Sequence, residues 1–417
     1  MVILLLLLVS LSSGQDILRI DLKKAVELAL TQNREILRIK KEILSLEDVY
    51  RAEKWDRFSP KIDLFTDRDS FTLFGSVLLL DFGNRLARIR SADLSVRIKR
   101  ELLREFERQV KIRVVKLFMD LYLAEKLAEV KREEMAVAYV RFDRERERLK
   151  EGLSDRVKVA EWESTYRRFR AELLEAQRKY NETLYRIKRF LGIDVEKPVE
   201  IDLSSLLEFT FPEDRVIDPS YILKRIENHY LVKVKTLEIA YLESRAKEQR
   251  RVFYPELYGF VTSFTPFDNF GRTRAEANLV LRVPLFDGRT SFYREKSFLD
   301  LKRAVEIEKR DITERLRERT LTLPYEWEEL VAEYQDAVAF DRWAQENLDL
   351  SRSNYELELA FDLGYAMSTK TEAERRVMEA KFRIILFLMR VYDLMGEDPM
   401  KAFSGEHPFF TERVEEI

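Results

Sequence analysis

The feature that most constrains the fold is a run of 68 residues, 84–151, that contains neither glycine nor proline. Apolar side chains recur within it every three or four residues, as at Leu103, Phe106 and Val110, which predicts one continuous amphipathic helix. At 1.5 Å per residue such a helix is roughly 100 Å long. Gly152-Leu153-Ser154-Asp155 follows, and 37 further residues with similar spacing reach Gly192. The sequence therefore predicts a helical hairpin that is too long to belong to a compact globule.

The composition agrees with long helices whose outer faces are solvated. Hydrophobic residues make up 46% of the chain and charged residues 36%, and only 11 Gly and 10 Pro occur among 417 residues. The formal net charge is −2, and basic residues are interleaved with acidic ones along the chain. No basic surface for nucleic acid is expected from this pattern.

The residues that enzymes and metal centres need are scarce. The chain has no cysteine, and His229 and His407 are its only histidines. No glycine-rich phosphate loop and no HExxH motif occur. We therefore expect no catalytic site, no cofactor and no metal ion, and we expect the protein not to be an enzyme.

The N-terminus carries a short apolar run, residues 1–9, followed by mostly small residues up to Gly14. The run is too short to cross a bilayer as a helix, and its length is typical of a secretory signal peptide. We expect residues 1–15 to be that signal, although no Lys or Arg precedes the apolar run. A buried N-terminal helix or a membrane anchor is the alternative interpretation.

Two segments change from helical to alternating periodicity. A helix that Asp21 can cap is expected to run to about Trp55, and residues 60–82 then alternate in a way that predicts a β-hairpin. Residues 255–287 predict a second hairpin, whose second strand alternates clearly between apolar and polar side chains. A long helix is expected after each hairpin, the second from about Thr290 to Leu359.

These elements occur twice. Asn33 precedes Pro60 by 27 residues, and Asn228 precedes Pro255 by the same number. Residues 193–218, which contain Pro198 and Pro212, separate the halves and are expected to be a linker. We interpret the mature chain, 16–417, as two structural repeats at about 16–195 and 215–400. In each repeat the summed length of the two shorter helices nearly equals the length of the long helix. The two shorter helices can therefore lie end to end along the long one.

The order and spacing of these motifs resemble the TolC-like outer-membrane efflux protein family, across essentially the whole mature chain. The residues that carry the resemblance are those of the opening helix, the approach to the second hairpin, the exits from both hairpins and the first helical tip: Leu22, Ala25, Ala29, Leu30 and Asn33; Tyr254-Pro255-Glu256-Leu257; Leu80-Asp81-Phe82-Gly83 and Val283-Pro284-Leu285-Phe286-Asp287-Gly288; and Gly152-Leu153-Ser154.

The resemblance implies a mainly α-helical protein with a membrane β-hairpin pair. It implies a homotrimer in which each chain gives four strands to one shared transmembrane β-barrel and its long coiled-coil hairpins to a hollow periplasmic α-barrel. Four strands cannot close a barrel alone, and open strand edges are not tolerated in lipid, which independently favours completion by other copies. The expected location is the outer membrane, extending into the periplasm, with a periplasmic adaptor and an inner-membrane transporter as partners.

The resemblance also assigns faces to the last strand. Ala277, Leu279, Leu281 and Val283 would face outer-membrane lipid, and Glu276, Asn278 and Arg282 would face the water-filled lumen. The alternative is an ordinary half-buried hairpin of a soluble protein, which shows the same alternation.

The helical tips are the remaining candidate sites. By resemblance, Gly152, Leu153 and Ser154 would contact the adaptor, whereas the alternative is a plain reversal between two helices. Asp362 is the carboxylate nearest the second tip and is the candidate for a charged aperture; alternatively it is a solvated helix cap. Pro324 is expected to kink the second long helix, as a hinge or only to relieve strain.

The sequence thus predicts a passive outer-membrane exit duct of an efflux pump or type I secretion system, opened at its helical tips by an adaptor. The alternatives are a periplasmic or soluble coiled-coil scaffold without channel activity and a cytoplasmic rod that keeps its N-terminus.

Overall fold

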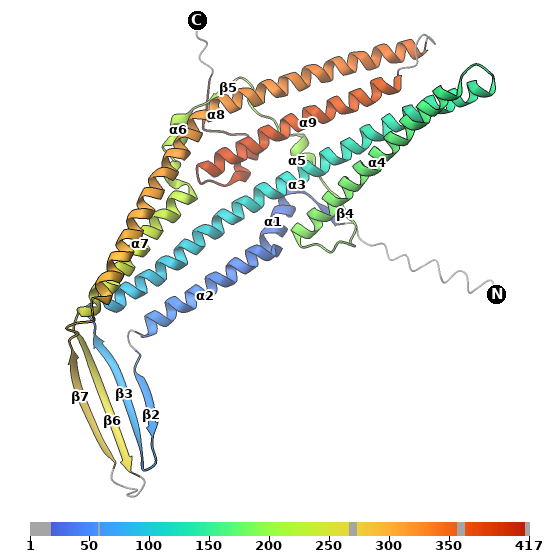
Figure 1. The fold of residues 1–417 in the computed structure, drawn as a ribbon. Coiled ribbons are helices and arrows are strands. Elements are labelled where there is room, and N and C mark those ends of the chain that lie inside the picture. The colour runs from blue at the N-terminus through green and yellow to red at the C-terminus, as the bar shows by residue number, and fades with distance from the viewer. Residues whose placement is uncertain (1–17, 57–58, 267–272, 357–362, 413–417) are drawn as a thin grey trace, which may run out of the picture. The chain divides into compact units, whose positions relative to one another are not determined.

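The computed structural model describes residues 18–56, 59–266, 273–356 and 363–412 (Figure 1). The predicted signal peptide at residues 1–15 lies outside these residues. Contacts divide the chain into two compact units. We call Leu37–Phe106 with Ile226–Glu318 the sheet unit, and Met1–Ile36 with Glu107–Arg225 and Arg319–Ile417 the helical unit. Each unit takes segments from both halves of the sequence.

The sheet unit holds four strands and the helices that adjoin them. Most of α2 and the first parts of α3 and α8 belong to it, together with α7 and two short 3-10 turns, η1 and η2. Their bounds are α2 Arg34–Asp56, β2 Lys61–Thr66, β3 Ser70–Leu80, α3 Asn84–Lys150, η1 Ile226–Asn228, α7 Tyr230–Arg250, η2 Arg251–Phe253, β6 Glu256–Pro266, β7 Arg274–Arg282 and α8 Thr290–Glu356.

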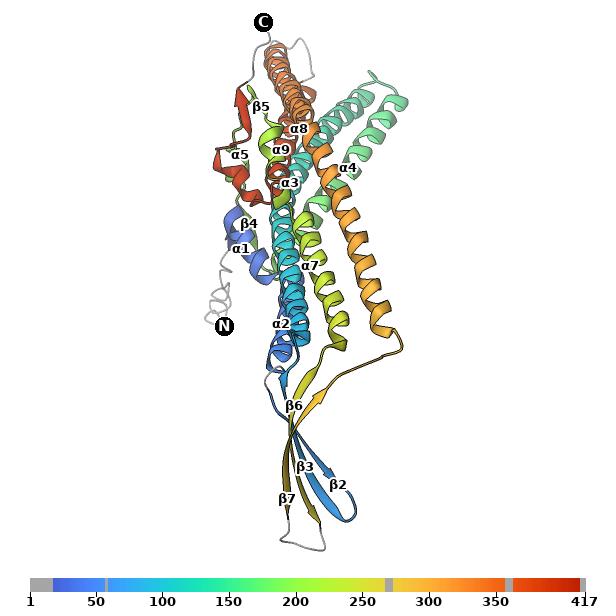
Figure 2. The same ribbon diagram turned by 90° about the vertical axis from the view of Figure 1, so that its left-hand side faces the viewer.

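The two predicted hairpins form and join into one antiparallel sheet with the strand order β2-β3-β6-β7 (Figures 1 and 2). Asp67 closes the first hairpin, because its carboxylate accepts hydrogen bonds from the Asp69 and Ser70 amides at 2.9 and 2.8 Å. The β3–β6 pairing connects the halves, with a register shift between Leu78 and Leu80. In the described strands, β2 and β7 each pair on one side only, so the sheet has two open edges.

The predicted continuous helix from Asp21 to Trp55 is wrong at Asn33. Asp21 does cap α1 (Leu22–Gln32), but Asn33 leaves the helical conformation with ψ 121° before α2 begins. Its side-chain oxygen accepts from the Glu35 amide at 3.0 Å, so the side chain replaces backbone hydrogen bonds and starts a new helix. A break also occurs at Asn228 in the second half, where His229 caps α7.

The helical unit contains the distal parts of the long helices. The predicted 68-residue helix is confirmed to within one residue as α3, and α8 stays helical through Pro324. The other elements of this unit are α4 Arg156–Leu191, α5 Ser204–Leu207, α6 Pro219–Leu223, α9 Leu363–Leu394, η3 Pro399–Ser404, β1 Leu18–Ile20, β4 Val199–Ile201, β5 Arg215–Ile217 and β8 Phe410–Glu412. Buried apolar residues of α3 and α9 form much of its core, including Val115, Phe118, Ile385 and Leu388.

The expected linker at 193–218 is more ordered than predicted. Its strand β4 pairs in parallel with β1, and β5 pairs antiparallel with β8 near the C-terminus. These strands have three residues each, too few for alternation to show in the sequence. The segment therefore ties both ends of the described chain into the helical unit.

Candidate functional site

The strand register places three of the four predicted lipid-facing residues on one apolar face of the whole sheet. Directly paired residues of an antiparallel sheet share a face. Ala277, Leu279 and Leu281 pair with Val261, Gly259 and Leu257 of β6. The same face continues across the sheet, and its residues on β3 and β2 include Leu73, Gly75, Val77, Ile62 and Leu64. An apolar stripe thus crosses all four strands.

Polar and aromatic side chains occupy the other face. Glu276, Asn278 and Arg282 pair with Thr262, Phe260 and Glu256. The Arg282 guanidinium lies 3.8 Å from the Glu256 carboxylate, and the Phe74 and Phe260 rings lie 5.3 Å apart. The division between faces is the one that a strand needs when one side meets lipid and the other meets water.

One residue of the predicted set lies outside the sheet. β7 ends at Arg282, so Val283 follows the strand instead of belonging to it. Pro284 comes next and has no amide hydrogen to give to a ladder, which explains the early end. The prediction that Val283 belongs to the last strand is therefore wrong.

The first helical tip ends α3 with two backbone hydrogen bonds. The Gly152 amide donates to the Leu149 carbonyl at 3.1 Å, and the Leu153 amide donates to Arg148 at 2.7 Å. This pair is the Schellman arrangement, and it requires the left-handed φ of 72° that Gly152 adopts. Ser154 Oγ donates to Glu145 at 2.6 Å, and Asp155 caps α4 through the Lys158 amide.

Leu153 at this tip is not used for packing. Its side chain is 65% exposed, although the residue in this position of a Schellman turn commonly packs back on the helix. Val157, in the first turn of α4, is 76% exposed. The predicted residues Gly152, Leu153 and Ser154 therefore form a rigid turn that presents an apolar side chain to solvent.

The second tip is described only in part. Asp362, the predicted aperture residue, lies outside the described residues. Gly364, which comes late for a turn, lies in the first turn of α9 against α3. A Cβ atom added to Gly364 would lie 2.3 Å from Val137 Cγ2, so the glycine permits close helix packing.

A groove lies beside this contact and was not predicted. Its volume is about 640 Å³, and its walls come from α3, α4, α8 and α9 of the helical unit. Apolar residues of the lining include Val137, Val140, Trp162, Tyr355 and Met367. The Arg141 guanidinium lies 5.1 Å from the Trp162 ring. The groove draws on four separate stretches of sequence, so no local motif signals it.

Glu133 supplies an acidic group to the groove. Burial raises the pKa of the Glu133 carboxyl; a hydrogen bond with Thr371 opposes the shift, and the neighbouring Glu129 and Glu374 carboxylates add to it. The Glu133 Oε2 atom is buried without a hydrogen-bond partner among the described residues. The groove therefore combines apolar walls with a carboxyl group that is less acidic than usual.

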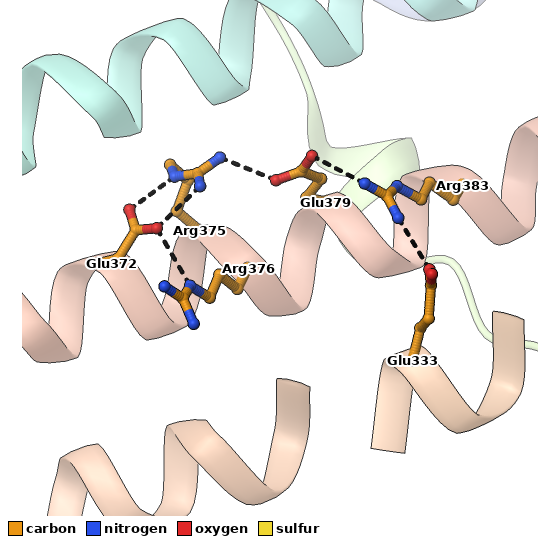
Figure 3. A network of polar contacts seen from close by, with 6 residues as sticks. All are labelled: Glu333, Glu372, Arg375, Arg376, Glu379 and Arg383. Atoms are coloured by element: carbon orange, nitrogen blue, oxygen red, sulfur yellow. Dashed lines mark hydrogen bonds and ion pairs between the residues drawn. The ribbon is translucent and has the colours of Figure 1, made fainter. Parts of the chain in front are cut away.

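A polar network runs along α9 and reaches α8 (Figure 3). Glu372 accepts from Arg375 at 2.7 Å and from Arg376 at 3.2 Å, and Arg375 also donates to Glu379 at 2.9 Å. Arg383 donates to Glu333 of α8 at 2.9 Å, and this bond raises the pKa of the Arg383 guanidinium. The network orders the polar face of α9 and connects it to α8.

No described helix is both long and apolar enough to cross a membrane. The described residues also contain no group of three or more His, Asp and Glu side chains that could hold a metal ion.

No protein-family model matches the sequence, and comparison with curated protein sequences finds no match. Solved structures do match. A membrane protein from Pseudomonas aeruginosa is 15% identical with a TM-score of 0.72, covering 92% of each chain. The Campylobacter jejuni CmeC outer membrane channel is 14% identical with a TM-score of 0.70, covering 92% of this chain and 88% of that one.

The outer membrane protein VceC from Vibrio cholerae is 13% identical with a TM-score of 0.67, covering 90% of this chain and 96% of that chain. These likenesses extend over nearly the full length of both partners, and they agree with the four-stranded sheet and the long helical hairpins described above. The chain therefore has the fold of the TolC-like outer-membrane efflux channels.

Proposed function

We propose that the protein is one subunit of a homotrimeric channel in the cell outer membrane. The observation that carries the proposal is a sheet with one apolar face and two open edges among the described strands, β2 and β7. Open edges are costly in lipid because their amide and carbonyl groups lack partners. Copies joined edge to edge satisfy these groups and enclose a water-filled lumen.

In this proposal the apolar face meets lipid and the polar face lines the lumen. Ala277, Leu279 and Leu281 lie against outer-membrane lipid, and Glu276, Asn278 and Arg282 contact the passing solution. Val283 follows β7 at the end of the sheet that adjoins the helices. The channel is a passive conduit and not an enzyme, and the long helices extend it into the periplasm.

Two matched variants test the assignment of faces. Leu279→Arg puts a charge into lipid, where Arg costs about 2 to 4 kcal/mol near the bilayer centre. This variant should therefore form less trimer, measured as the trimer band that a detergent gel shows before the sample is heated. Asn278→Arg, on the neighbouring residue, should keep the trimer and shift the ion selectivity of conductance in planar bilayers toward anions. A soluble monomer that does not conduct would instead support the coiled-coil scaffold.

We further propose that a periplasmic adaptor binds the first tip and that an inner-membrane transporter supplies the energy for export. The exposed Leu153 supports adaptor binding, because the Schellman turn fixes its position without burying it. The groove beside Val137 offers a second apolar surface of the same unit. Opening follows when the adaptor binds the open arrangement of the tips more tightly than the closed one.

Leu153→Asp tests adaptor binding in cells that export a measured compound. Export should be lost while the trimer still forms and conducts, because the charge replaces an apolar contact at the tip only. Leu153→Met is the matched control and should retain export. Normal export by the Asp variant would rule out this tip as the adaptor site.

A further inference from the structure

A band of basic residues surrounds the end of the sheet that adjoins the helices. We define the collar as the described connector residues at each strand end plus the nearest seven residues of each helix: 50–56, 59–60, 81–90, 244–255 and 283–296. These segments contain twelve Lys and Arg and six Asp and Glu. By contrast, the stretches of sequence between β2 and β3, 67–69, and between β6 and β7, 267–273, contain two basic and three acidic residues. The positive charge is thus concentrated at one end of the sheet, in a chain whose net charge is −2.

The collar's acidic groups are mostly satisfied within the collar or close to it. Glu53 binds Arg88 at 2.6 Å, and Glu248 binds Arg245 at 2.8 Å. Asp81 and Asp287 accept amide hydrogen bonds at the starts of α3 and α8. These contacts engage four of the six acidic groups, and the cations outnumber all six acids.

Six cations of the collar are left exposed. Among the described residues they form no ion pair with any acidic group. They are Lys54, Arg90, Arg250, Arg289, Arg294 and Lys296. Five of them lie on the four helices that adjoin the sheet, and Arg289 directly precedes α8. The free charge therefore follows the strand ends and does not gather on one helix face.

Exposed aromatic side chains are interleaved with these cations. Trp55 is 73% exposed, Phe286 is 79% exposed and Tyr293 is 61% exposed. Aromatic residues with large exposed surfaces are costly in water but favourable at the boundary between lipid headgroups and acyl chains. Their neighbours Lys54 and Arg294 are placed to reach the headgroups from that level.

We propose that the collar binds the phosphate groups of anionic phospholipids in the membrane leaflet on the helix side. This inference rests on the proposed insertion of the sheet in a membrane. Charge complementarity supports it, since each exposed Lys or Arg close to an anionic surface strengthens binding about fivefold at low salt. A folded acidic protein fits less well, because the cations are spread over four chain segments and mixed with aromatics.

The test uses the full-length trimer in vesicles whose lipids carry brominated acyl chains, which quench tryptophan fluorescence. Trp55 reports on the collar, and Trp55→Phe identifies its share of the signal. One set of vesicles mixes brominated phosphatidylglycerol with unlabelled phosphatidylcholine, and a second set mixes brominated phosphatidylcholine with unlabelled phosphatidylglycerol. Comparing the quenching in the two sets gives the affinity of the collar for one lipid relative to the other. We expect the anionic lipid to be preferred about tenfold at low salt. The preference should fall toward one in about 0.5 M salt, because salt screens these charges.

Two variants that lose the same number of positive charges distinguish lipid binding by the collar from a general effect of the protein's net charge. The collar variant replaces the six exposed cations with Gln and should lose the preference. The control variant replaces six exposed cations outside the collar that form no described ion pair, and should retain it. The control residues are Arg34, Lys40, Lys41, Arg170, Arg189 and Arg342.

The outcomes distinguish this inference from the proposed function. Wild-type protein that inserts and conducts in pure phosphatidylcholine but shows no preference for the anionic lipid would overturn the collar alone. A preference lost equally in both variants would also overturn it. Protein that neither inserts nor conducts in any lipid would overturn the proposed function and the collar with it. If the collar variant fails to fold, the salt dependence of the wild type is the test. A lipid preference that does not fall in about 0.5 M salt would contradict binding by the collar cations.

Discussion

The indole Nε1–H of Trp327 donates a hydrogen bond to the carbonyl oxygen of Arg215, 2.9 Å away. Trp327 lies on α8, and Arg215 begins strand β5 of the segment between the repeats. The indole is 1% exposed, and its ring lies 4.8 Å from that of Phe410 in β8. One side chain thus joins the long helix to both strands of the small β5–β8 sheet.

Trp327→Ala should destabilise the helical unit by about 3 to 5 kcal/mol, because it leaves a cavity and removes the hydrogen bond. The measurement is hydrogen exchange of the β5 and β8 amides together with the urea midpoint of the protein. Trp343→Ala, at a side chain that is 51% exposed, is the control and should change little. Equal effects of the two variants would contradict the role of Trp327.

His407 should make the C-terminal strand sensitive to acid. Burial lowers the pKa of His407 below its ordinary value of about 6.5. As the pH falls through about 6.5, the opened segment takes up a proton and the packed one does not, so opening becomes easier. This loss of stability ends once the pH is below the lowered pKa of the packed state. Above about pH 6.5 both states are neutral and stability is at its full value.

Exchange of the β8 amides, corrected for the intrinsic pH dependence of exchange, measures this effect. His407→Phe keeps an aromatic ring beside Phe409 and Phe410 and removes the titrating group. Protection of β8 should then stay constant between about pH 7 and pH 5. A wild type with equally constant protection would show that His407 does not control the strand.

Gly364→Ala should separate α9 from α3 at their contact. The new Cβ atom would lie 2.3 Å from Val137 Cγ2, so a helix or the valine must shift, at a cost of about 1 to 3 kcal/mol. Val137→Ala removes the clashing atom. The double variant should therefore be more stable than Gly364→Ala alone, and a double-mutant cycle on urea midpoints measures the coupling. Additive effects would mean that the two residues do not contact each other.

Gly152→Ala should loosen the first tip by about 1 to 2 kcal/mol. A Cβ atom at Gly152 meets nothing within 4 Å, so the cost comes only from holding φ at 72°. Gly152→Asn should cost less, because Asn tolerates the left-handed conformation better. Hydrogen exchange of the amides at 145–158 measures both. An equal loss in the two variants would point to a side-chain effect instead of backbone strain.

The long elements could be predicted because their signals are repeated many times. The 67 residues of α3 have no glycine or proline, and Gly152 and Gly192 each end a helix with positive φ. Alternation along β7 predicted a strand whose register then places Leu279 opposite Gly259. These features depend on local sequence, so a single chain reveals them.

The short and distant features could not be predicted in the same way. The break at Asn33 depends on one side chain that competes with the helix, and helical spacing continues on both sides of it. The β1–β4 pair joins Leu18 to Val199, and the Gly364–Val137 contact joins α9 to α3. Such pairings form only when segments that are distant in the sequence pack together. The periodicity of either segment alone does not predict them.

The two open edges of the sheet have different lengths, six residues in β2 and nine in β7. A ring that joins β2 of one copy to β7 of the next is head to tail, so every subunit takes part in two different seams. A substitution that prevents pairing at one edge of one subunit therefore prevents the whole ring from closing. In a cell that makes equal amounts of normal and edge-defective chains, only about one in eight of the proposed trimers would be wholly normal. Edge variants should consequently be genetically dominant, whereas substitutions in the helical cores should be recessive.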